Sequence, residues 1–312
     1  MSIYDRHKAD KAGDALFRGI AYFFALSVIL LMALIFIVLL KESWLSLKTF
    51  GFGFFVSTDW DPVSGSFGAL PAIWGTVVSS VIAIFIALPI SLGIAIFLTE
   101  MAPKSMKGPI GTAIELLASI PSIIYGMWGL FVFAPLLSDY VEPYLIDYLG
   151  FIPLFRGAPM GIGMLPAGFI LAIMIIPFIS SVTRDIFQMV PAMLKESGYG
   201  VGATKWEVIS KVVVPYTKSG IIGAVILGLG RALGETMAVT FVIGNSHEIS
   251  LALLNPATSI SATLANEFTE AVEEIYLSSL VELGLILFII TFVVLALAKL
   301  LIKRTALEGG RR

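Results

Sequence analysis

Apolar residues in this chain come in long uninterrupted runs. The first run, 19–40, contains 22 residues without a charge and lies between Arg18 and Lys41. A helix crosses the hydrocarbon core of a membrane in about 20 apolar residues. Strands of a membrane barrel instead alternate in polarity over about 10 residues, and these runs do not. The pattern predicts an all-α polytopic membrane protein with six transmembrane helices, at 19–40, 70–98, 110–137, 161–182, 221–244 and 280–302.

Composition narrows the class of protein further. Hydrophobic residues make up 58% of the chain and charged residues 13%, against roughly 45–50% and 25% in soluble domains. A disordered chain is excluded, and a soluble enzyme would lack the polar surface to cover its core. With no cysteine, disulfides, iron–sulfur clusters and thiol chemistry are excluded as well. We expect no catalytic residues, no metal site, no cofactor and no nucleic-acid partner.

The basic residues predict how the chain lies in the membrane. Of the 20 Lys and Arg residues, 16 lie in the two tails, at the C-terminal end of span six and in the loops after spans two and four, and three lie in the other loops. Cytoplasmic loops carry an excess of Lys and Arg, so both termini are predicted to be cytoplasmic. The domain organisation is then a cytoplasmic tail at 1–18, a permease domain at 19–302 and a second cytoplasmic tail at 303–312.

The loop after span four is predicted to be a helical hairpin at 191–215. Pro191 suits the first position of a short helix, which the glycines up to Gly202 then break. Thr204 with Glu207 three residues later is a capping-box pattern that begins a second helix, and Pro215 is expected to limit its end. The hairpin is too short and too polar to span the membrane. It either lies at the membrane interface or contacts a soluble partner.

The spacing of this hairpin resembles a known family motif. Glu196, Gly202 and Pro215 keep the spacing of the EAA loop of ABC importer permeases, while Ser197 and Gly198 replace its two alanines. In that family the loop forms a coupling helix that sits in a cleft of the ATPase subunit. The resemblance implies a type I importer architecture and a role in ATPase coupling for Glu196, Gly202 and Pro215. The chain itself contains no phosphate-binding loop of the Walker type, so ATP hydrolysis would belong to another polypeptide.

Span five carries the candidate pathway residues. Arg231 and Glu235 are four residues apart and are expected to share one helix face, with Thr236 beside them. Ionisable residues inside a span mark a substrate pathway in many membrane proteins. The planar guanidinium of Arg suits an oxyanion, because it bonds two oxygens at once and stays charged. A structural ion pair between Arg231 and Glu235 is the alternative. Gly230 and Gly234 are expected to let another helix approach closely.

A second resemblance points to the substrate. The stretch 230–239, Gly-Arg-Ala-Leu-Gly-Glu-Thr-Met-Ala-Val, resembles a signature of phosphate-specific ABC permeases, in which the Arg and the Glu are implicated in translocation. The stretches 67–76 and 115–129 also resemble this family, and the first is closer to its PstC-type subunit than to its PstA-type subunit. The resemblance implies a multi-pass permease in the inner membrane of a prokaryote, surrounded by membrane lipid and transporting inorganic phosphate. The implied protein partners are a PstA-type permease, a PstB-type ATPase and a PstS-type phosphate-binding protein.

Other functions remain open at this stage. A permease for sulfate or molybdate would share the hairpin and the intramembrane Arg. An ion-coupled secondary transporter would use Arg231 and Glu235 as a relay, and would be expected to show internal repeats with broken helices. A membrane scaffold or receptor would explain the acidic loop before span six, which contains Glu248, Glu267 and Glu270. The acidic residues of that loop are either simply tolerated there or form a docking surface for a basic partner.

Three smaller features complete the sequence reading. Glu115 is expected near the cytoplasmic interface rather than in the substrate pathway. Ser119 and Pro121 interrupt span three, and the serine is expected to satisfy backbone groups there. The two histidines, His7 and His247, are interpreted as isolated residues.

Overall fold

The computed structural model describes residues 3–309, with side chains described for residues 14–300. Within this part of the chain, six helices are long and apolar enough to cross a membrane. Their number confirms the prediction, and no β-strand is present among the described residues beyond two isolated bridges. The six spans are Asp14–Glu42, Leu70–Met101, Ser122–Leu149, Met164–Gln188, Lys205–Leu233 and Glu274–Leu300.

Several spans are built from more than one helical segment. The spans contain α1 (Ile3–Glu42), α4 (Leu70–Ile96), α6 (Ser122–Trp128), α7 (Ala134–Leu136), α8 (Glu142–Leu149), α9 (Met164–Gln188), α11 (Lys205–Val208), α12 (Val214–Leu233) and α15 (Glu274–Gly309). Wider π-helical turns join segments at η1 (Phe97–Met101), η2 (Gly129–Phe133), η3 (Leu137–Val141) and η5 (Ile209–Val213). The connecting elements are α2 (Trp44–Phe50), α3 (Gly53–Val56), α5 (Lys104–Ala118), the 3₁₀ turn η4 (Pro153–Phe155), α10 (Ala192–Gly200), α13 (Met237–Val242) and α14 (Ile260–Glu267).

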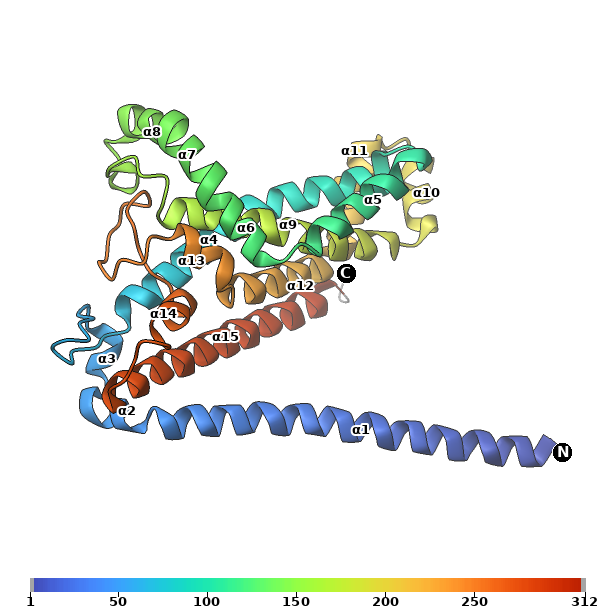
Figure 1. The fold of residues 1–312 in the computed structure, drawn as a ribbon. Coiled ribbons are helices and arrows are strands. Elements are labelled where there is room, and N and C mark those ends of the chain that lie inside the picture. Colours follow the sequence, from blue (N-terminus) through green and yellow to red (C-terminus); the bar gives the residue numbers. More distant parts are fainter. Residues whose placement is uncertain (1–2, 310–312) are drawn as a thin grey trace.

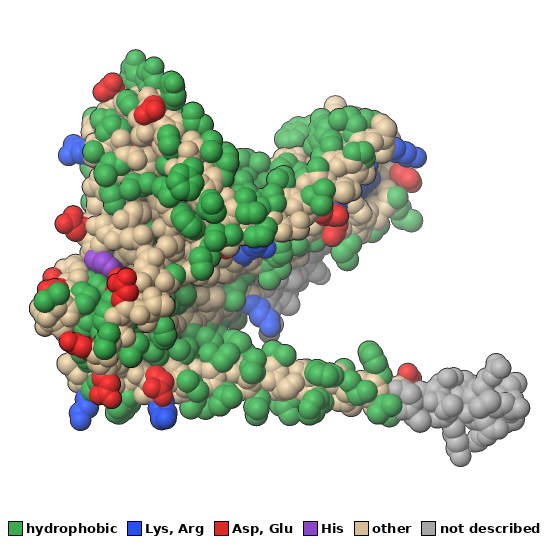
Figure 2. All heavy atoms as spheres, in the orientation of Figure 1, with side chains coloured by type: hydrophobic (Ala, Val, Ile, Leu, Met, Phe, Trp, Pro, Cys, Tyr) green, Lys and Arg blue, Asp and Glu red, His purple; other side chains and the backbone are tan. Residues whose placement is uncertain are grey.

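The bundle is organised around α9, the most buried of the six spans. It packs along α4 over its length, and α12, α5 and α13 cover its other sides (Figure 1). The main core contains Ile170, Leu171, Ile175 and Ile179 of α9, all fully buried. Helix α1 is different, because it meets α2 and α15 at one end and then diverges from the bundle (Figure 1). Figure 2 shows the hollow between α1 and the bundle and the apolar side chains along α1.

Span three lies further along the chain than predicted. We expected 110–137, but α5 ends at Ala118 and the span begins at Ser122. Pro121 cannot donate a backbone hydrogen bond, and the carbonyl groups of Leu116 and Leu117 at the end of α5 accept from the Ser119 and Ile120 amides and from side chains as well. As predicted, Ser119 repairs the backbone, since its Oγ donates to the Leu116 carbonyl at 2.7 Å. The Tyr125 hydroxyl donates to the Leu117 carbonyl at 2.8 Å.

Span three continues past the predicted limit at 137 and contains a buried acid. Glu142 lies beyond that limit, and its side chain is fully buried. Its Oε2 accepts a hydrogen bond from the Gly161 amide at 2.8 Å, which joins α8 to the segment that enters α9. A polar group with such a partner is tolerated inside the protein, so the helix continues to Leu149.

Both predicted tails continue the helices next to them. Helix α1 begins at Ile3 and α15 reaches Gly309, so neither 3–18 nor 303–309 is separated from its span by a break. Residues 1–2 and 310–312 of the tails lie outside the described residues. Helix α1 runs toward the end of the molecule with α2, and α15 runs back from that end toward the end with α10 and α11 (Figure 1). Which of these ends faces the cytoplasm stays a prediction.

Gly75 of α4 lies directly against the chain before α14, and its replacement tests the fold. A Cβ at this position would lie 1.8 Å from the Thr258 carbonyl oxygen, so Gly75→Ala must push the chain before α14 away from α4. We expect loss of a folded complex, measured by yield and thermal unfolding after purification. Gly93→Ala in the same helix is the matched control, because nothing lies within 4 Å of its Cβ. Equal unfolding temperatures for the two variants would contradict this packing.

Candidate functional site

The candidate pathway residues lie where the fifth span ends, at a break in the helix before α13. We expected one helix over 221–244, but α12 ends at Leu233 and α13 begins at Met237. Arg231 and Glu235 therefore do not share a continuous helix face, and that prediction is wrong. Two contacts satisfy the freed groups: the Glu235 carboxylate accepts from the Ala238 amide at 3.3 Å, and the Ser261 hydroxyl donates to the Glu235 carbonyl at 2.6 Å. Such side-chain contacts let a backbone break exist at membrane depth.

Arg231 stands in the last turn of α12 with its side chain exposed. Its guanidinium carbon lies 6.0 Å from the centre of the Phe178 ring. Among the side chains of residues 14–300, none forms an ion pair with Arg231, and Glu235 uses its carboxylate on the backbone instead. An unpaired arginine facing lipid is costly, so its charge has to meet water, a ligand or another subunit.

The other predicted members of the site have distinct positions. Thr236 lies in the break, and its carbonyl accepts the Thr240 hydroxyl at 2.8 Å. Gly230 faces α15, where a Cβ would make an ordinary van der Waals contact at 3.4 Å with a methyl carbon of Leu295, so the predicted close approach of a helix is not found at this position. At Gly234 the nearest atom is the carbonyl oxygen of Gly230 in its own helix. The space around Gly234 therefore accompanies the break in the chain and does not accommodate a packed helix.

The predicted hairpin is present as α10, a turn and α11. Gly202 forms the turn with φ +84°, a left-handed conformation that glycine adopts without strain. The predicted capping box is confirmed: the Glu207 carboxylate accepts from the Thr204 amide at 3.0 Å, and the Glu207 amide donates to the Thr204 hydroxyl at 3.4 Å. A Cβ on Gly198 would lie 3.0 Å from Val208, so the two arms of the hairpin pack closely.

The second arm of the hairpin does not end at Pro215, contrary to the prediction. Helix α11 passes through the wide turn η5 directly into α12, with Pro215 in the first turn of α12. A wider turn accommodates a proline that cannot donate its backbone hydrogen bond. The hairpin and span five thus form one mechanical unit that ends at the break beside Arg231.

The hairpin is anchored on one side and exposed on the other. Lys195 forms an ion pair with Glu100 at the end of span two, and Val213 packs with Phe187 and Ala95. Glu196, Gly202 and Pro215 all lie at the surface. Four large apolar side chains are exposed near these three residues: Met193, Tyr199, Val201 and Trp206. Contiguous exposed apolar surface of this kind marks an interaction site.

Glu115 lies at the same end of the molecule as the hairpin. Its carboxylate forms an ion pair with Arg184 of α9 at 3.0 Å and is exposed. The carboxylate is therefore engaged by Arg184, and the position of Glu115 at the membrane interface stays a prediction.

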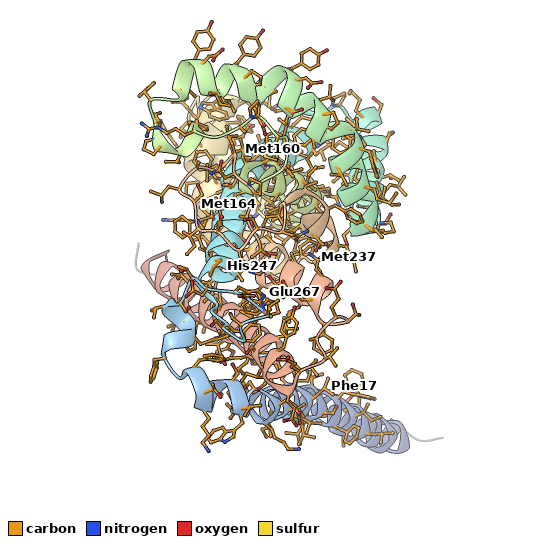
Figure 3. All side chains as sticks on the ribbon, turned by 60° about the vertical axis from the view of Figure 1, so that its left-hand side comes forward. Phe17, Met160, Met164, Met237, His247 and Glu267 are labelled. Carbon is orange, nitrogen blue, oxygen red and sulfur yellow. The ribbon has the colours of Figure 1, made fainter. Side chains whose placement is uncertain are left out.

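One cluster escaped the sequence reading. His247, interpreted as isolated, stacks on Trp60 with ring centres 5.3 Å apart, and its Nε2 lies 2.9 Å from Glu267. The Trp60 indole and the Tyr276 hydroxyl each donate to Glu267 at 2.7 Å. Figure 3 places His247 beside Glu267 at the end of α14. These residues are far apart in the sequence, so no local spacing signals the cluster. Glu267 is therefore turned inward, while Glu248 and Glu270 remain exposed.

Comparisons with known proteins agree with this geometry. The chain matches the family model described as "Binding-protein-dependent transport system inner membrane component" over residues 91–307. It is 56% identical over 303 residues to the phosphate transport system permease protein PstC of Pasteurella multocida, covering 96% of this chain and 94% of that one. The chain belongs to this family, and within it to the PstC-type permeases. The PstC protein of Mesorhizobium japonicum is 58% identical over 301 residues, covering 95% and 92% of the two chains.

Solved structures support the same fold for this PstC-type permease. A chain of the bacterial ABC transporter involved in the import of alginate superposes with a TM-score of 0.56 at 18% identity, covering 93% of this chain and 98% of that one. A chain of the MetNI methionine ABC transporter in an inward-facing conformation gives a TM-score of 0.56 at 15% identity, covering 75% and 94%. At these identities the likeness concerns the fold alone, which is that of an ABC importer permease.

The cluster around Glu267 predicts an acid-sensitive step in stability. Burial raises the pKa of Glu267, but the hydrogen bonds from His247, Tyr276 and Trp60 outweigh it and hold the pKa below the usual 4.5. The carboxylate therefore stabilises the folded state fully above pH 4.5, and this contribution is lost as the pH falls through the lowered pKa. We expect the thermal midpoint of the purified complex to drop more steeply below pH 4.5 in the wild type than in Glu267→Gln.

Glu270→Gln is the control for this experiment, because Glu270 is exposed and lies three residues away. It should keep the wild-type pH slope. Identical slopes for the wild type and Glu267→Gln would contradict the charged state of the cluster.

Proposed function

We propose that this chain is a permease subunit of an ATP-driven importer of inorganic phosphate, and that it forms the translocation pathway together with a second permease of the PstA type. The observation that carries the proposal is the exposed, unpaired Arg231 at the break of span five, in a chain whose curated relatives are named phosphate transport system permeases. The chain performs no covalent chemistry in this scheme. It lies in the inner membrane of a prokaryote with both termini in the cytoplasm.

Arg231 supplies the positive charge that a phosphate ion meets inside the membrane. Its side chain leaves the last turn of α12 without a carboxylate partner among the described side chains, so its donors are available to phosphate oxygens. A guanidinium offers paired N–H donors that match two oxygens of one phosphate. Glu235 and Thr236 contribute by shaping the break: the Glu235 carboxylate holds the start of α13 and keeps clear of Arg231.

The hairpin transmits the movement of an ATPase to this break. Glu196, Gly202 and Pro215 lie on the surface that would contact a PstB-type ATPase, beside exposed Tyr199 and Trp206. Because α11 continues through η5 into α12, a push on the hairpin acts along span five toward Arg231. ATP hydrolysis belongs to the partner, since this sequence has no phosphate-binding loop. A PstS-type protein would deliver the phosphate at the opposite end.

The rival functions have weaker support. A permease for sulfate or molybdate would use the same Arg231 chemistry, but the close relatives are named for phosphate. An ion-coupled secondary transporter leaves the exposed hairpin surface without a role. A relay between Arg231 and Glu235 would also need contact between them, and Glu235 is bound to the Ala238 amide.

Replacing Arg231 tests the pathway. We expect Arg231→Gln to lower ATP-dependent uptake of labelled phosphate about 100-fold, because a charge-assisted pair of hydrogen bonds is lost. Uptake is measured in vesicles that hold this chain with its co-purifying subunits, with and without ATP and with sulfate or molybdate as competitors. Arg156→Gln is the control, since Arg156 donates only to carbonyl groups of its own loop. Normal uptake in Arg231→Gln would refute the site, and ATP-independent uptake would refute the importer.

Replacing Gly202 tests the coupling. A β-branched residue at φ +84° is strained, so Gly202→Val should distort the turn between α10 and α11. We expect phosphate uptake to fall at least tenfold while ATP hydrolysis by the complex continues, or the ATPase to dissociate on purification. Gly200→Ala is the control, because nothing lies within 4 Å of its Cβ. A Gly202→Val complex with normal uptake and normal stoichiometry would contradict the role of the hairpin.

A further inference from the structure

Helix α15 carries a carboxyl group that has no role in the proposed transport scheme. Glu282 is fully buried, and neither of its carboxylate oxygens has a hydrogen-bond partner among the described residues. Within residues 14–300, no basic side chain forms an ion pair with it. A buried carboxylate without a partner is strongly unfavourable, so its charge has to be removed or compensated. An acid inside a span is also a candidate site whose partner has to be named.

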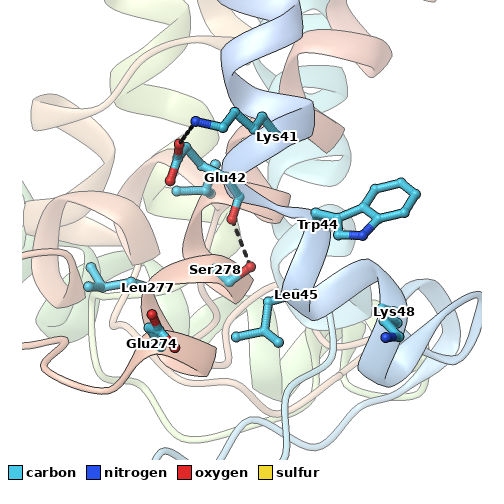
Figure 4. Close-up of a pocket in the computed structure, with 9 residues that line it drawn as sticks. Lys41, Glu42, Trp44, Leu45, Lys48, Glu274, Leu277 and Ser278 are labelled. Carbon is cyan, nitrogen blue, oxygen red and sulfur yellow. Dashed lines mark hydrogen bonds and ion pairs between the residues drawn. The ribbon is translucent and has the colours of Figure 1, made fainter.

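The polar surroundings of this carboxyl are hydroxyl groups. Four serines are buried where α2 meets α15, and they are Ser43, Ser46, Ser278 and Ser279. The side chain of Ser46 faces the Glu282 carboxyl but is not hydrogen-bonded to it. Figure 4 shows the open cavity at this corner, and Glu282 does not line it. The carboxyl is thus enclosed between two helices.

Two of these serines use their hydroxyl protons on the backbone. Ser43 donates to the Leu40 carbonyl at 3.3 Å. Ser278 donates to the Glu42 carbonyl at 2.8 Å (Figure 4) and accepts from the Ser46 amide at 3.1 Å. A hydroxyl carries one proton, so neither serine has a proton left for another acceptor.

The other two serines form a chain that runs away from Glu282. The Ser279 hydroxyl donates to the Ile275 carbonyl at 2.8 Å, so it has to accept at its 3.1 Å contact with the Ser46 hydroxyl. Ser46 therefore gives its proton to Ser279 and presents only lone pairs to Glu282. An ionised Glu282 would present only lone pairs as well, and two acceptors that face each other repel. A proton on Glu282 removes this conflict.

We propose that Glu282 is a buried proton-binding site: it is a neutral carboxylic acid whose O–H donates to the Ser46 hydroxyl. One chain of donors then runs from Glu282 through Ser46 and Ser279 to the Ile275 carbonyl, with a proton in every contact. The bound proton lets α2 pack on α15 at the end of the molecule opposite the hairpin (Figure 1). This site is independent of the transported substrate.

The charged groups of the neighbouring elements all have other positions. Lys41 and Glu42 at the end of α1 are 81% and 58% exposed. Lys48 of α2 and Glu274 of α15 line the open cavity. Glu267 at the end of α14 belongs to the cluster with His247. None of these side chains bonds to the buried carboxyl, so the proton is what neutralises it.

Infrared spectroscopy of the purified complex tests for this proton. At about pH 7 exposed glutamates are ionised, so a neutral acid is recognised by the C=O stretching band of a protonated carboxyl group. We expect the difference spectrum between the wild type and Glu282→Gln to contain one such band. Ser46→Ala should keep the band and shift it, because the acid loses its acceptor. Glu274→Gln is the matched control, since Glu274 is exposed in the first turn of the same helix and its replacement should remove no such band.

Thermal unfolding of the same complexes gives a second measurement. Gln is neutral, has nearly the shape of Glu and keeps an N–H donor for Ser46. Glu282→Gln should therefore unfold at the wild-type midpoint or above it. Absence of the band, or a lower midpoint in Glu282→Gln, would overturn the proposal, because either result indicates an ionised carboxylate that a cation or a water molecule stabilises.

An unshifted band in Ser46→Ala would overturn the assignment of Ser46 as the acceptor. Both measurements are made without phosphate uptake, so they stand or fail separately from the proposed transport function.

Discussion

Hydrocarbon offers no hydrogen-bond partner to a peptide group, so departures from regular helix in this bundle are accompanied by side chains that bond the freed groups or by a change in the helical turn. At the end of α5 these side chains are Ser119 and Tyr125, which donate to the carbonyls before Pro121. At the break of span five they are Glu235 and Ser261. Where no side chain replaces the missing hydrogen bond, the helix widens into a π turn, as at η5 before Pro215. The break at the candidate pathway is possible because its freed backbone groups have these hydrogen-bond partners.

Helix α14 connects that break to the opposite cluster. The Ser261 hydroxyl in its first turn holds the Glu235 carbonyl, and Glu267 at its last residue receives Trp60, His247 and Tyr276. The same region is fixed against α4, where the Thr76 hydroxyl accepts from the Ile260 amide and Gly75 lies against Thr258. A rigid eight-residue helix thus spans the distance between the outer cluster and the pathway break. From the other side, the hairpin reaches the same break through α11, η5 and α12.

The sequence predicted what short spacing and local chemistry control. The capping box of Thr204 and Glu207 and the turn at Gly202 were each expected from neighbouring residues, and each is present. The predicted limit of span three at 137 was too early, because the span continues through Glu142, whose partner, the Gly161 amide, lies in another segment. The prediction that Arg231 and Glu235 share one helix face was wrong. Ser261, 26 residues from Glu235, stabilises a break that helical periodicity does not reveal.

By itself, the sequence determined six membrane spans, a hairpin after the fourth and an arginine at membrane depth, because hydrophobic length, glycine and proline positions and capping residues act within a few residues of each other. The tertiary structure alone decided that Glu235 binds the backbone and leaves Arg231 unpaired, and that His247 joins Trp60, Glu267 and Tyr276. It also decided that the Glu282 carboxyl is enclosed between α2 and α15. These outcomes depend on contacts between residues far apart in the chain, which exist only once the helices have packed.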